Sequence, residues 1–361
     1  MGMRAYNFNA GPAALPYEVL QRAQAELPDY EGSGMSIMEM SHRSKAYELV
    51  HERAKEQLRS LLGVAEETHI LFLQGGASMQ FGMVPMNFLH PEQVACYVQS
   101  GNWSNKAFKE AKLVGDARLV AASDTRPLTA PDLRGLELPA NTAYLHVTSN
   151  ETIEGLRLGS LPDTGNTPIV CDMSSDILSR SIDASRYGLI YAGAQKNLGP
   201  SGVTVVIVKP EMLSKANQTL PSMLRYEVHA KGNSLYNTPP TFAIYLMSLV
   251  LDWVTQQGGL PAISARNTRK AGLIYQAIDD SDGFYTGLVA KPDRSDMNIT
   301  FGLADELLEP AFLSASVQAG FVGLKGHREL GHFRASTYNA VPEEHCQALA
   351  DFMRDFMRQH G

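Results

Sequence analysis

Short, continuous apolar runs alternate with stretches of helical periodicity along most of the chain. Each run covers only a few residues and ends near a glycine, an aspartate or a small residue, as expected for strands that are buried on both faces of a sheet. The predicted strands are Thr68–Leu73, Gln93–Gln99, Ala143–Val147, Pro168–Cys171, Gly188–Tyr191 and Val203–Val208. The first predicted helices are Tyr17–Leu27 and Glu48–Leu62. The pattern predicts an α/β fold with a mostly parallel central sheet flanked by helices.

The pattern changes after a predicted helix at Tyr245–Thr255, where Gly258 and Gly259 follow. The remaining elements are helices near Pro261–Asp279 and His345–Gln359 and strands at Met297–Phe301 and Gly331–Ser336. We therefore expect an N-terminal segment (1–15), a large domain (16–257) and a smaller α+β C-terminal domain (258–361).

Composition and charge narrow the class of protein. Of the 361 residues, 44% are apolar and 19% are charged, which is ordinary for a globular enzyme. The formal net charge is −7 and no Lys/Arg-rich run occurs, so a nucleic-acid partner is not expected and an anionic substrate must be held by a few placed cations. No signal segment or membrane span is recognisable, so we expect a cytoplasmic protein without membrane contact. Cys96, Cys171 and Cys346 form no CxxC pair and no metal-ligand cluster, so they are interpreted as buried side chains and no metal is predicted.

Two residues just beyond predicted strands point to a specific chemistry. Working residues of parallel sheets lie at such strand ends. Lys196 lies among small residues in AGAQKNLG, where partial burial would lower the pKa of its amine and free it to form a Schiff base. Asp172 ends the run PIVCD and could pair with a pyridinium nitrogen. The alternatives are a solvated lysine and an N-cap for a helix at Met173–Leu178.

Two other strand ends suit a flat, phosphorylated ligand. The turn Gly75–Ser78 (GGAS) opens a helix, so its backbone N–H groups could approach a phosphate at the helix N-terminus. Such turns are common, and this one is neither a P-loop nor GxGxxG. Trp103 could stack on a heteroaromatic ring, although an ordinary core tryptophan is the alternative.

Basic residues gather near the C-terminal end of this acidic chain, in GLKGHRELGHFRAS. His327 and Arg328 suit a phosphate, whereas Arg334 suits a carboxylate held by two hydrogen bonds. Arg43 is a further candidate for an anion, or it pairs with an acid such as Glu39. Solvated surface charges are the alternative for the whole group.

Several longer segments occur in a fixed order: NFNAGPAALP, MSHRS, QGGAS, GNWS, SNETIEG, CDMSSDILSR, YAGAQKNLGPSG, YNTPP and GLKGHRELGHFRASTYNA. From Asn7 to beyond Asn339 they closely resemble the phosphoserine aminotransferase family. That family belongs to class V of the aminotransferases that use pyridoxal 5'-phosphate (PLP) and have PLP-transferase fold type I.

The resemblance implies a role for each matching residue. Lys196 would bind the cofactor as a Schiff base and move the substrate α-proton, with Asp172 on the ring nitrogen and Trp103 stacked on the ring. Thr152 would hydrogen-bond the ring hydroxyl. The cofactor phosphate would be held by Gly76, Ala77, Ser78 and Gln195, and from a partner subunit by Asn237 and Thr238. Substrate carboxylates would bind Arg334 and Arg43, and the substrate phosphate would bind His327 and Arg328.

These roles imply ping-pong transamination between L-glutamate and 3-phosphohydroxypyruvate in serine biosynthesis. They also imply a homodimer with shared active sites and an N-terminal segment near them. In some bacteria the family also uses a phosphorylated threonine-like precursor in pyridoxine synthesis. Ala10 and Ser78 replace a serine and an arginine of some members, which matters only if side chains make those contacts.

Other classes of protein are less consistent with the sequence. A serine- or alanine-glyoxylate aminotransferase would share the fold but would not need the pair His327 and Arg328. A cysteine desulfurase needs a reactive cysteine on a mobile loop, whereas these cysteines lie in predicted strands and a helix. A PLP-binding regulator would need a DNA-binding domain, for which no segment is left. A dinucleotide-dependent dehydrogenase would need a glycine fingerprint in the first strand-to-helix turn.

Overall fold

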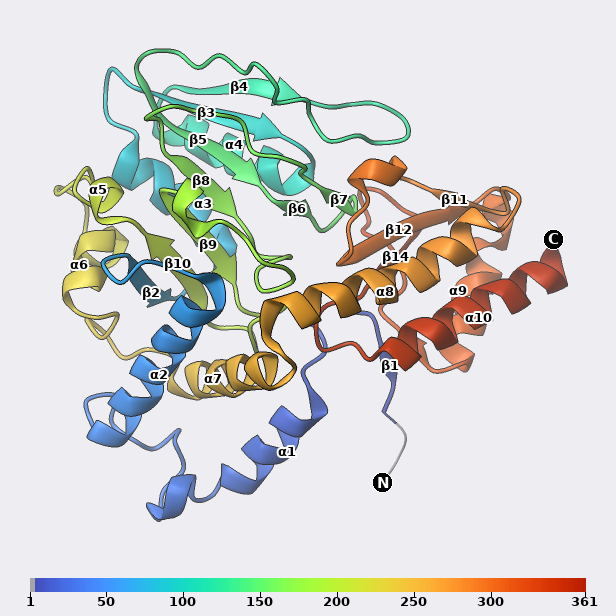
Figure 1. Cartoon of the computed structure of the whole chain (residues 1–361), viewed down its shortest axis with the longest axis horizontal. Helices are drawn as coiled ribbons and strands as arrows, with labels where there is room; N and C mark the ends of the chain where they lie inside the picture. Colours follow the sequence, from blue (N-terminus) through green and yellow to red (C-terminus); the bar gives the residue numbers. More distant parts are fainter. Residues whose placement is uncertain (1–3) are drawn as a thin grey trace.

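A seven-stranded sheet with helices on both faces dominates the computed structural model, which describes residues 4–361 (Figure 1). The strand order is β2-β10-β9-β8-β5-β3-β4. The strands are β2 (His69–Leu73), β3 (Val94–Gln99), β4 (Ala117–Ala122), β5 (Thr142–Thr148), β8 (Ile169–Asp172), β9 (Leu189–Gly193) and β10 (Thr204–Val208). Strand β10 is antiparallel to both of its neighbours, and the other four pairings are parallel. The predicted α/β fold with a mostly parallel sheet is therefore confirmed.

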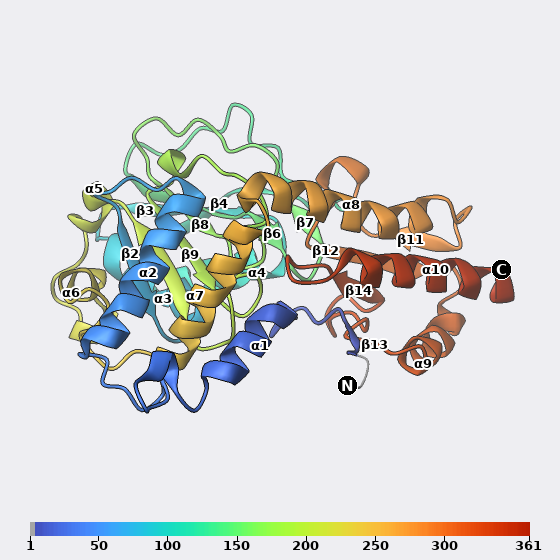
Figure 2. The same cartoon turned by 60° about the horizontal axis from the view of Figure 1, so that its bottom comes forward.

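Side chains of alternate residues on each strand enter two separate apolar clusters. On β3, Cys96 and Val98 pack with helices on one face, whereas Ala95 and Tyr97 pack with helices on the other. The first face is covered by α1 (Tyr17–Glu26), α2 (Lys45–Leu62) and α7 (Thr241–Gln256), and the second by α3 (Gly76–Phe88), α4 (Asn102–Val114), α5 (Pro210–Leu213) and α6 (Tyr226–Lys231) (Figure 2). Burial on both faces explains why the strands appear in the sequence as continuous apolar runs.

The chain after α7 builds a third apolar cluster, to the right in Figure 1. Its elements are α8 (Gly259–Asp279), β11 (Tyr285–Gly287), β12 (Asn298–Leu303), α9 (Glu309–Gln318), β13 (Phe321–Val322), β14 (Phe333–Ser336) and α10 (Glu343–His360). The N-terminal segment joins this part, because β1 (Tyr6–Asn7) pairs with β13 and Phe8 is buried in the same cluster. The division into domains after residue 257 stays a prediction, and residues 1–3 of the predicted N-terminal segment lie outside the described residues.

Several elements of the structure differ from the sequence prediction. The pattern gave no sign of β4, an edge strand that leaves Arg118 and Leu119 exposed, so it lacks a continuous apolar run. The short hairpin of β6 (Asn150–Glu151) and β7 (Leu156–Arg157) was also not predicted. Turns rather than a helix follow Asp172. Across residues 4–361, no helix is long and apolar enough to cross a membrane.

Candidate active site

A cavity of about 400 Å³ lies where the parallel strands of the large sheet end. Strands β3, β5, β8 and β9 run in one direction, so their carboxyl ends bring residues from distant parts of the sequence to one edge. The lining includes ten residues predicted from the sequence, namely Gly76, Ala77, Ser78, Trp103, Thr152, Asp172, Gln195, Lys196, His327 and Arg334. Ala10 and Gly11 of the N-terminal segment also contribute to its wall.

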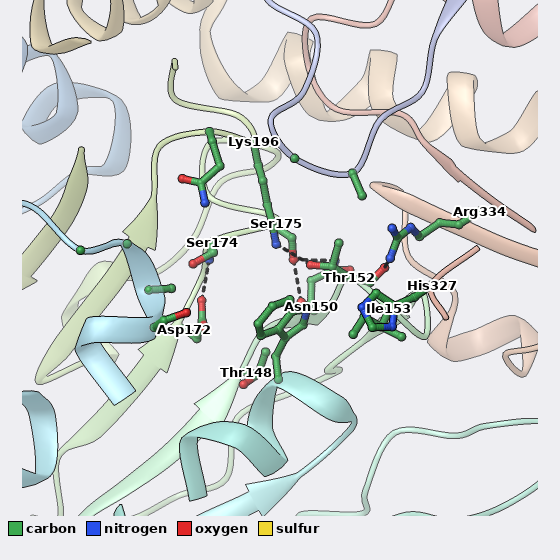
Figure 3. A pocket seen from close by; sticks show the side chains of 18 residues that line it. Thr148, Asn150, Thr152, Ile153, Asp172, Ser174, Ser175, Lys196, His327 and Arg334 are labelled. Carbon is green, nitrogen blue, oxygen red and sulfur yellow. Dashed lines mark hydrogen bonds between the residues drawn. The ribbon is translucent and has the colours of Figure 1, made fainter. Parts of the chain in front are cut away.

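Lys196 points its amine into the middle of the cavity (Figure 3). Its Nζ donates a hydrogen bond to Thr152 Oγ1 at 2.5 Å. Burial lowers the pKa of Lys196 to about 8, although the charge of Asp172 partly opposes this shift. At pH 7 about a tenth of this amine is therefore neutral and nucleophilic, far more than for an ordinary lysine.

Asp172 ends β8 on one side of Lys196, opposite Arg334 and His327 (Figure 3). Its Oδ1 accepts a hydrogen bond from the backbone N–H of Ser174 at 2.8 Å. Burial raises the pKa of Asp172, whereas the hydrogen bonds from Ser174 and the charge of Lys196 lower it. A buried carboxylate in this position is best satisfied by a cationic partner, such as a protonated ring nitrogen. The N-cap interpretation of Asp172 is wrong in so far as no helix follows it.

Two helix N-termini border the cavity. Helix α3 begins at Gly76 after Gly75, whose φ of +90° is in the left-handed region that favours glycine. No side chain of residues 4–361 caps α3, so its first N–H groups remain available to an anion such as a phosphate. Helix α4 carries Trp103, whose ring centre lies 5.8 Å from Lys196 Nζ. This ring is therefore placed to stack on a flat ligand bound at Lys196.

Arg334 and His327 lie on the side of the cavity away from Asp172 (Figure 3). Arg334 Nη1 donates to the backbone carbonyl of Thr152 at 3.1 Å, and its buried Nε has no partner within the described part of the chain. His327 also lines the cavity, and burial lowers the pKa of its imidazole. The neighbouring Arg328 is exposed and does not line the cavity.

Three other predicted residues also lie outside the cavity wall of their own subunit. Arg43 is exposed in the turn before α2, and no ion pair joins it to Glu39 among residues 4–361. Thr238 is exposed and Asn237 is half-buried, in the segment before α7. The carbonyl of Thr238 accepts a hydrogen bond from Gln74 Nε2 at 3.3 Å, next to the α3 turn. The contacts with cofactor or substrate that the sequence predicts for Arg43, Asn237 and Thr238 therefore stay predictions.

The sequence analysis assigned no role to two glutamates that support the site. Glu151 accepts hydrogen bonds from the backbone N–H groups of Trp103 and Ser104, at 3.0 and 2.9 Å. Glu154 accepts from the backbone N–H of Asn102 at 2.9 Å. The only sequence signal for this role is the segment SNETIEG, which contains both glutamates. Their hydrogen-bond partners lie about fifty residues earlier in the sequence, so no local pattern reveals the contacts.

The side chains around the cavity fit PLP. They offer an amine for its aldehyde, a carboxylate for its ring nitrogen, an aromatic face for its ring and a helix N-terminus for its phosphate. Thr148 Oγ1 and Trp103 Nε1 are buried without a hydrogen-bond partner in the described residues, as expected of a wall that faces a polar ligand. The described residues contain no group of three or more His, Cys, Asp or Glu that could hold a metal ion.

Comparisons with known proteins agree on one family. The profile described as "Aminotransferase class-V" matches residues 5–349. A phosphoserine aminotransferase from Niallia circulans is 58% identical over 362 residues, which is 100% of both chains. The solved structure of a phosphoserine aminotransferase from Bacillus circulans subsp. alkalophilus has a TM-score of 0.97 and 58% identity, covering 99% of each chain. A PLP-bound phosphoserine aminotransferase from Trichomonas vaginalis has a TM-score of 0.92 and 40% identity, covering 97% of this chain and 100% of that chain.

Proposed function

The chain belongs to the class-V aminotransferase family, and we propose that it transfers the amino group of L-glutamate to 3-phosphohydroxypyruvate. The products are 2-oxoglutarate and O-phospho-L-serine, which makes this a step of serine biosynthesis. The enzyme is a transaminase and its cofactor is PLP. The observation that carries the proposal is one cavity in which the Lys196 amine lies between Asp172 and Arg334.

Each of the central residues has a distinct task in this reaction. Bound PLP supplies an electron sink for the bond that breaks at the substrate α-carbon. Lys196 Nζ would hold the cofactor, and its amine would take the substrate α-proton and return it. Asp172 would keep a positive charge on the ring nitrogen of the cofactor, and the hydroxyl of Thr152 orients the lysine amine.

The two substrates need the same two anion sites. Glutamate and phosphoserine each carry an α-carboxylate and one further anionic group. We assign the α-carboxylate to Arg334, whose Nε is free to form a second hydrogen bond. His327 and Arg328 take the phosphate, with Arg43 as a further cation for a substrate carboxylate. Because both substrates use one site in turn, the kinetics are ping-pong. The same carboxylate and phosphate sites would also accept 4-phosphohydroxy-L-threonine.

We further propose a cytoplasmic homodimer with shared active sites. Asn237, Thr238 and Arg43 do not line the cavity of their own subunit, which is the arrangement expected if they complete the partner's site. Large apolar side chains are exposed near the same rim, including Met79 at 44% and Tyr236 at 52%. Exposed apolar groups of this size are typical of a surface that a second subunit covers.

An assay of the purified, PLP-loaded protein with glutamate as donor tests the function. It compares 3-phosphohydroxypyruvate with hydroxypyruvate and glyoxylate as acceptors. We expect a strong preference for the phosphorylated acceptor, because the unphosphorylated ones leave the cationic side of the cavity unpaired. A preference for glyoxylate or hydroxypyruvate would refute the proposed substrate while leaving Lys196 and Asp172 in their roles.

A further inference from the structure

Two buried glutamates, Glu151 and Glu154, cap the N-terminus of α4, the helix that carries Trp103. Glu151 is fully buried and Glu154 is 6% exposed. The Glu151 carboxylate accepts hydrogen bonds from Trp103 N, Ser104 N and Ser100 Oγ at 3.0, 2.9 and 3.1 Å. The Glu154 carboxylate accepts from Asn102 N and Nδ2, each at 2.9 Å. The first turn of α4 is therefore held by two carboxyl groups from one short hairpin.

The two carboxyl groups lie close together against Gly101. A Cβ added at Gly101 would lie 2.7 Å from Glu154 Cδ and 2.8 Å from Glu151 Cδ. Two negative charges this close, and away from water, repel each other strongly, so such pairs hold one proton between them. The residue between them, Thr152, binds Lys196 through its hydroxyl and Arg334 through its carbonyl.

The hydrogen bonds show which group carries the proton. Both oxygens of Glu151 accept hydrogen bonds, which favours its charged form. Both donors to Glu154 reach Oε1, whereas its Oε2 is buried without a partner among residues 4–361. A bare carboxylate oxygen in that place would be costly, whereas a protonated Oε2 carries an O–H for which the adjacent Glu151 carboxylate is the nearby acceptor.

We propose that Glu151 and Glu154 form an acid–carboxylate pair with a single proton on Glu154 Oε2, and that this pair positions Trp103 and Thr152 at the cofactor site. The effect of the pair on the cofactor site rests on the proposed function, whereas the presence of a single proton on the pair does not. Above the pKa of Glu154 the second charge pushes the two groups apart and shifts the start of α4. The pair consists of positioning residues, because neither carboxylate lines the cavity.

Other charged groups near the pair come from several elements. Arg334 on β14 interacts with the charge of Glu154, and Lys196, which follows β9, interacts with that of Glu151. Lys106 lies one turn after Trp103 on α4, with Nζ 4.5 Å from the indole ring centre, and its charge acts on His327. The charges of these groups also act on the site, so a test must compare variants of the pair itself. Burial, followed by the charge of Glu151, raises the pKa of Glu154 to about 7, within reach of such a test.

Two substitutions separate the members of the pair. Glu154→Gln keeps an acceptor for Asn102 and places an uncharged NH₂ where the protonated oxygen lies. Glu151→Gln instead turns an NH₂ group toward backbone donors. We expect Glu154→Gln to keep kcat/KM within about threefold of the parent and Glu151→Gln to lower it by about tenfold or more, because the latter leaves buried donors unpaired.

Fluorescence of Trp103 provides a readout independent of turnover. The chain has two tryptophans, so Trp253→Phe makes Trp103 the single emitter. In this background we expect the emission of Trp103 to change across about pH 6–8, in both PLP-loaded and cofactor-free protein. When Glu154→Gln is added, the emission should stay at its low-pH value throughout that range. The proposal would be overturned if both glutamine variants lowered kcat/KM equally, or if Trp103 emission had the same pH profile with and without Glu154→Gln. If Glu151→Gln does not fold by circular dichroism, the two pH profiles decide alone. The cofactor-free profile also separates failure of the pair from failure of the proposed function.

Discussion

The environment of Lys196 differs from that of a surface lysine in two respects that matter for catalysis. Burial lowers the pKa of its amine to about 8, and a neutral hydroxyl rather than a carboxylate is its hydrogen-bond partner. A tight ion pair would hold the amine in its charged, non-nucleophilic form. The hydroxyl of Thr152 orients the amine without that penalty, which fits the role we propose for Lys196 in bond formation and proton transfer.

Replacement of Lys196 by alanine should abolish transamination. The variant loses both the covalent attachment of PLP and the proton carrier, so we expect no detectable turnover and no lysine labelled after borohydride reduction. Lys209→Ala is the matched control, because Lys209 also follows a strand of the sheet but its Nζ donates to the carbonyl of Ser185. Full activity of Lys196→Ala would refute the central assignment.

Arg328→Ala tests whether the exposed arginine beside His327 binds phosphate. We expect KM for phosphorylated substrates to rise about 10- to 100-fold, the usual effect of losing a charge-assisted hydrogen bond. The glutamate half-reaction, followed by cofactor absorbance in a single turnover, should survive. Lys325→Ala, an exposed cation in the same loop, should leave both half-reactions unchanged. Equal loss of both half-reactions in Arg328→Ala would indicate a structural role instead.

At the residue scale, the sequence predicts the residues whose chemistry is unusual for their position. Lys196, Asp172 and Trp103 were recognisable because each follows an apolar strand, and the structure brings them into one cavity. The roles of Glu151 and Glu154 were not predicted, because in the sequence a buried glutamate in a polar loop cannot be distinguished from a solvent-exposed glutamate. Their role depends on helix α4, which approaches them only in the folded chain.

Among the secondary-structure elements, those buried on both sides were the predictable ones. The inner strands and the long helices deviate from their predicted bounds by a few residues only. Strand β4 and the β6–β7 hairpin were missed because their stability comes from tertiary contacts and not from an apolar pattern. The hairpin matters most, since it carries Thr152 and both carboxyl groups of the α4 cap.

Gly155, in the turn of this hairpin, should tolerate no side chain. Its φ is +73°, and an added Cβ would lie 2.5 Å from the carbonyl oxygen of Asn298. We expect Gly155→Ala to lower the free energy of unfolding by about 2–4 kcal/mol, from left-handed strain and the clash together. The measurement is the midpoint of urea unfolding of the PLP-loaded protein.

A second glycine separates strain from crowding. Gly165 has a φ of +56°, but an added Cβ there would meet no described atom within 4 Å. Gly165→Ala should therefore cost only about 1 kcal/mol, the contribution of the left-handed backbone. If both variants unfold at the same urea concentration, the close approach of β12 to the hairpin turn does not contribute to stability.

For the whole molecule, the cavity depends on segments from both ends of the chain. Ala10 and Gly11 close it from the N-terminal segment and Arg334 from β14, while β1 and β13 tie these parts together. Periodicity along a sequence carries no information about such distant contacts, so the location of Arg334 beside Thr152 followed only from the folded chain. We propose that Asn237 and Thr238 likewise act from a distant segment, in the site of a partner subunit.

Mixing two inactive variants tests whether the sites are shared between subunits. Lys196→Ala removes the amine, and Thr238→Arg places a bulky cation in the segment that we assign to the partner's site. In a mixed dimer, one site combines both changes, whereas the other has an intact Lys196 and an intact Thr238. Random reassortment should therefore restore about a quarter of the parent activity, because half of the dimers are mixed and each has one intact site.

The control for this experiment is the order of mixing. Subunits combined after brief unfolding and refolding should recover activity, whereas folded dimers mixed without exchange should not. Exchange itself is checked by mass spectrometry of a tagged and an untagged parent chain. If mixed dimers form but stay inactive, Thr238 belongs to the site of its own subunit. Its carbonyl contact with Gln74, at the start of the α3 turn, would then be the route by which it acts on the cofactor phosphate.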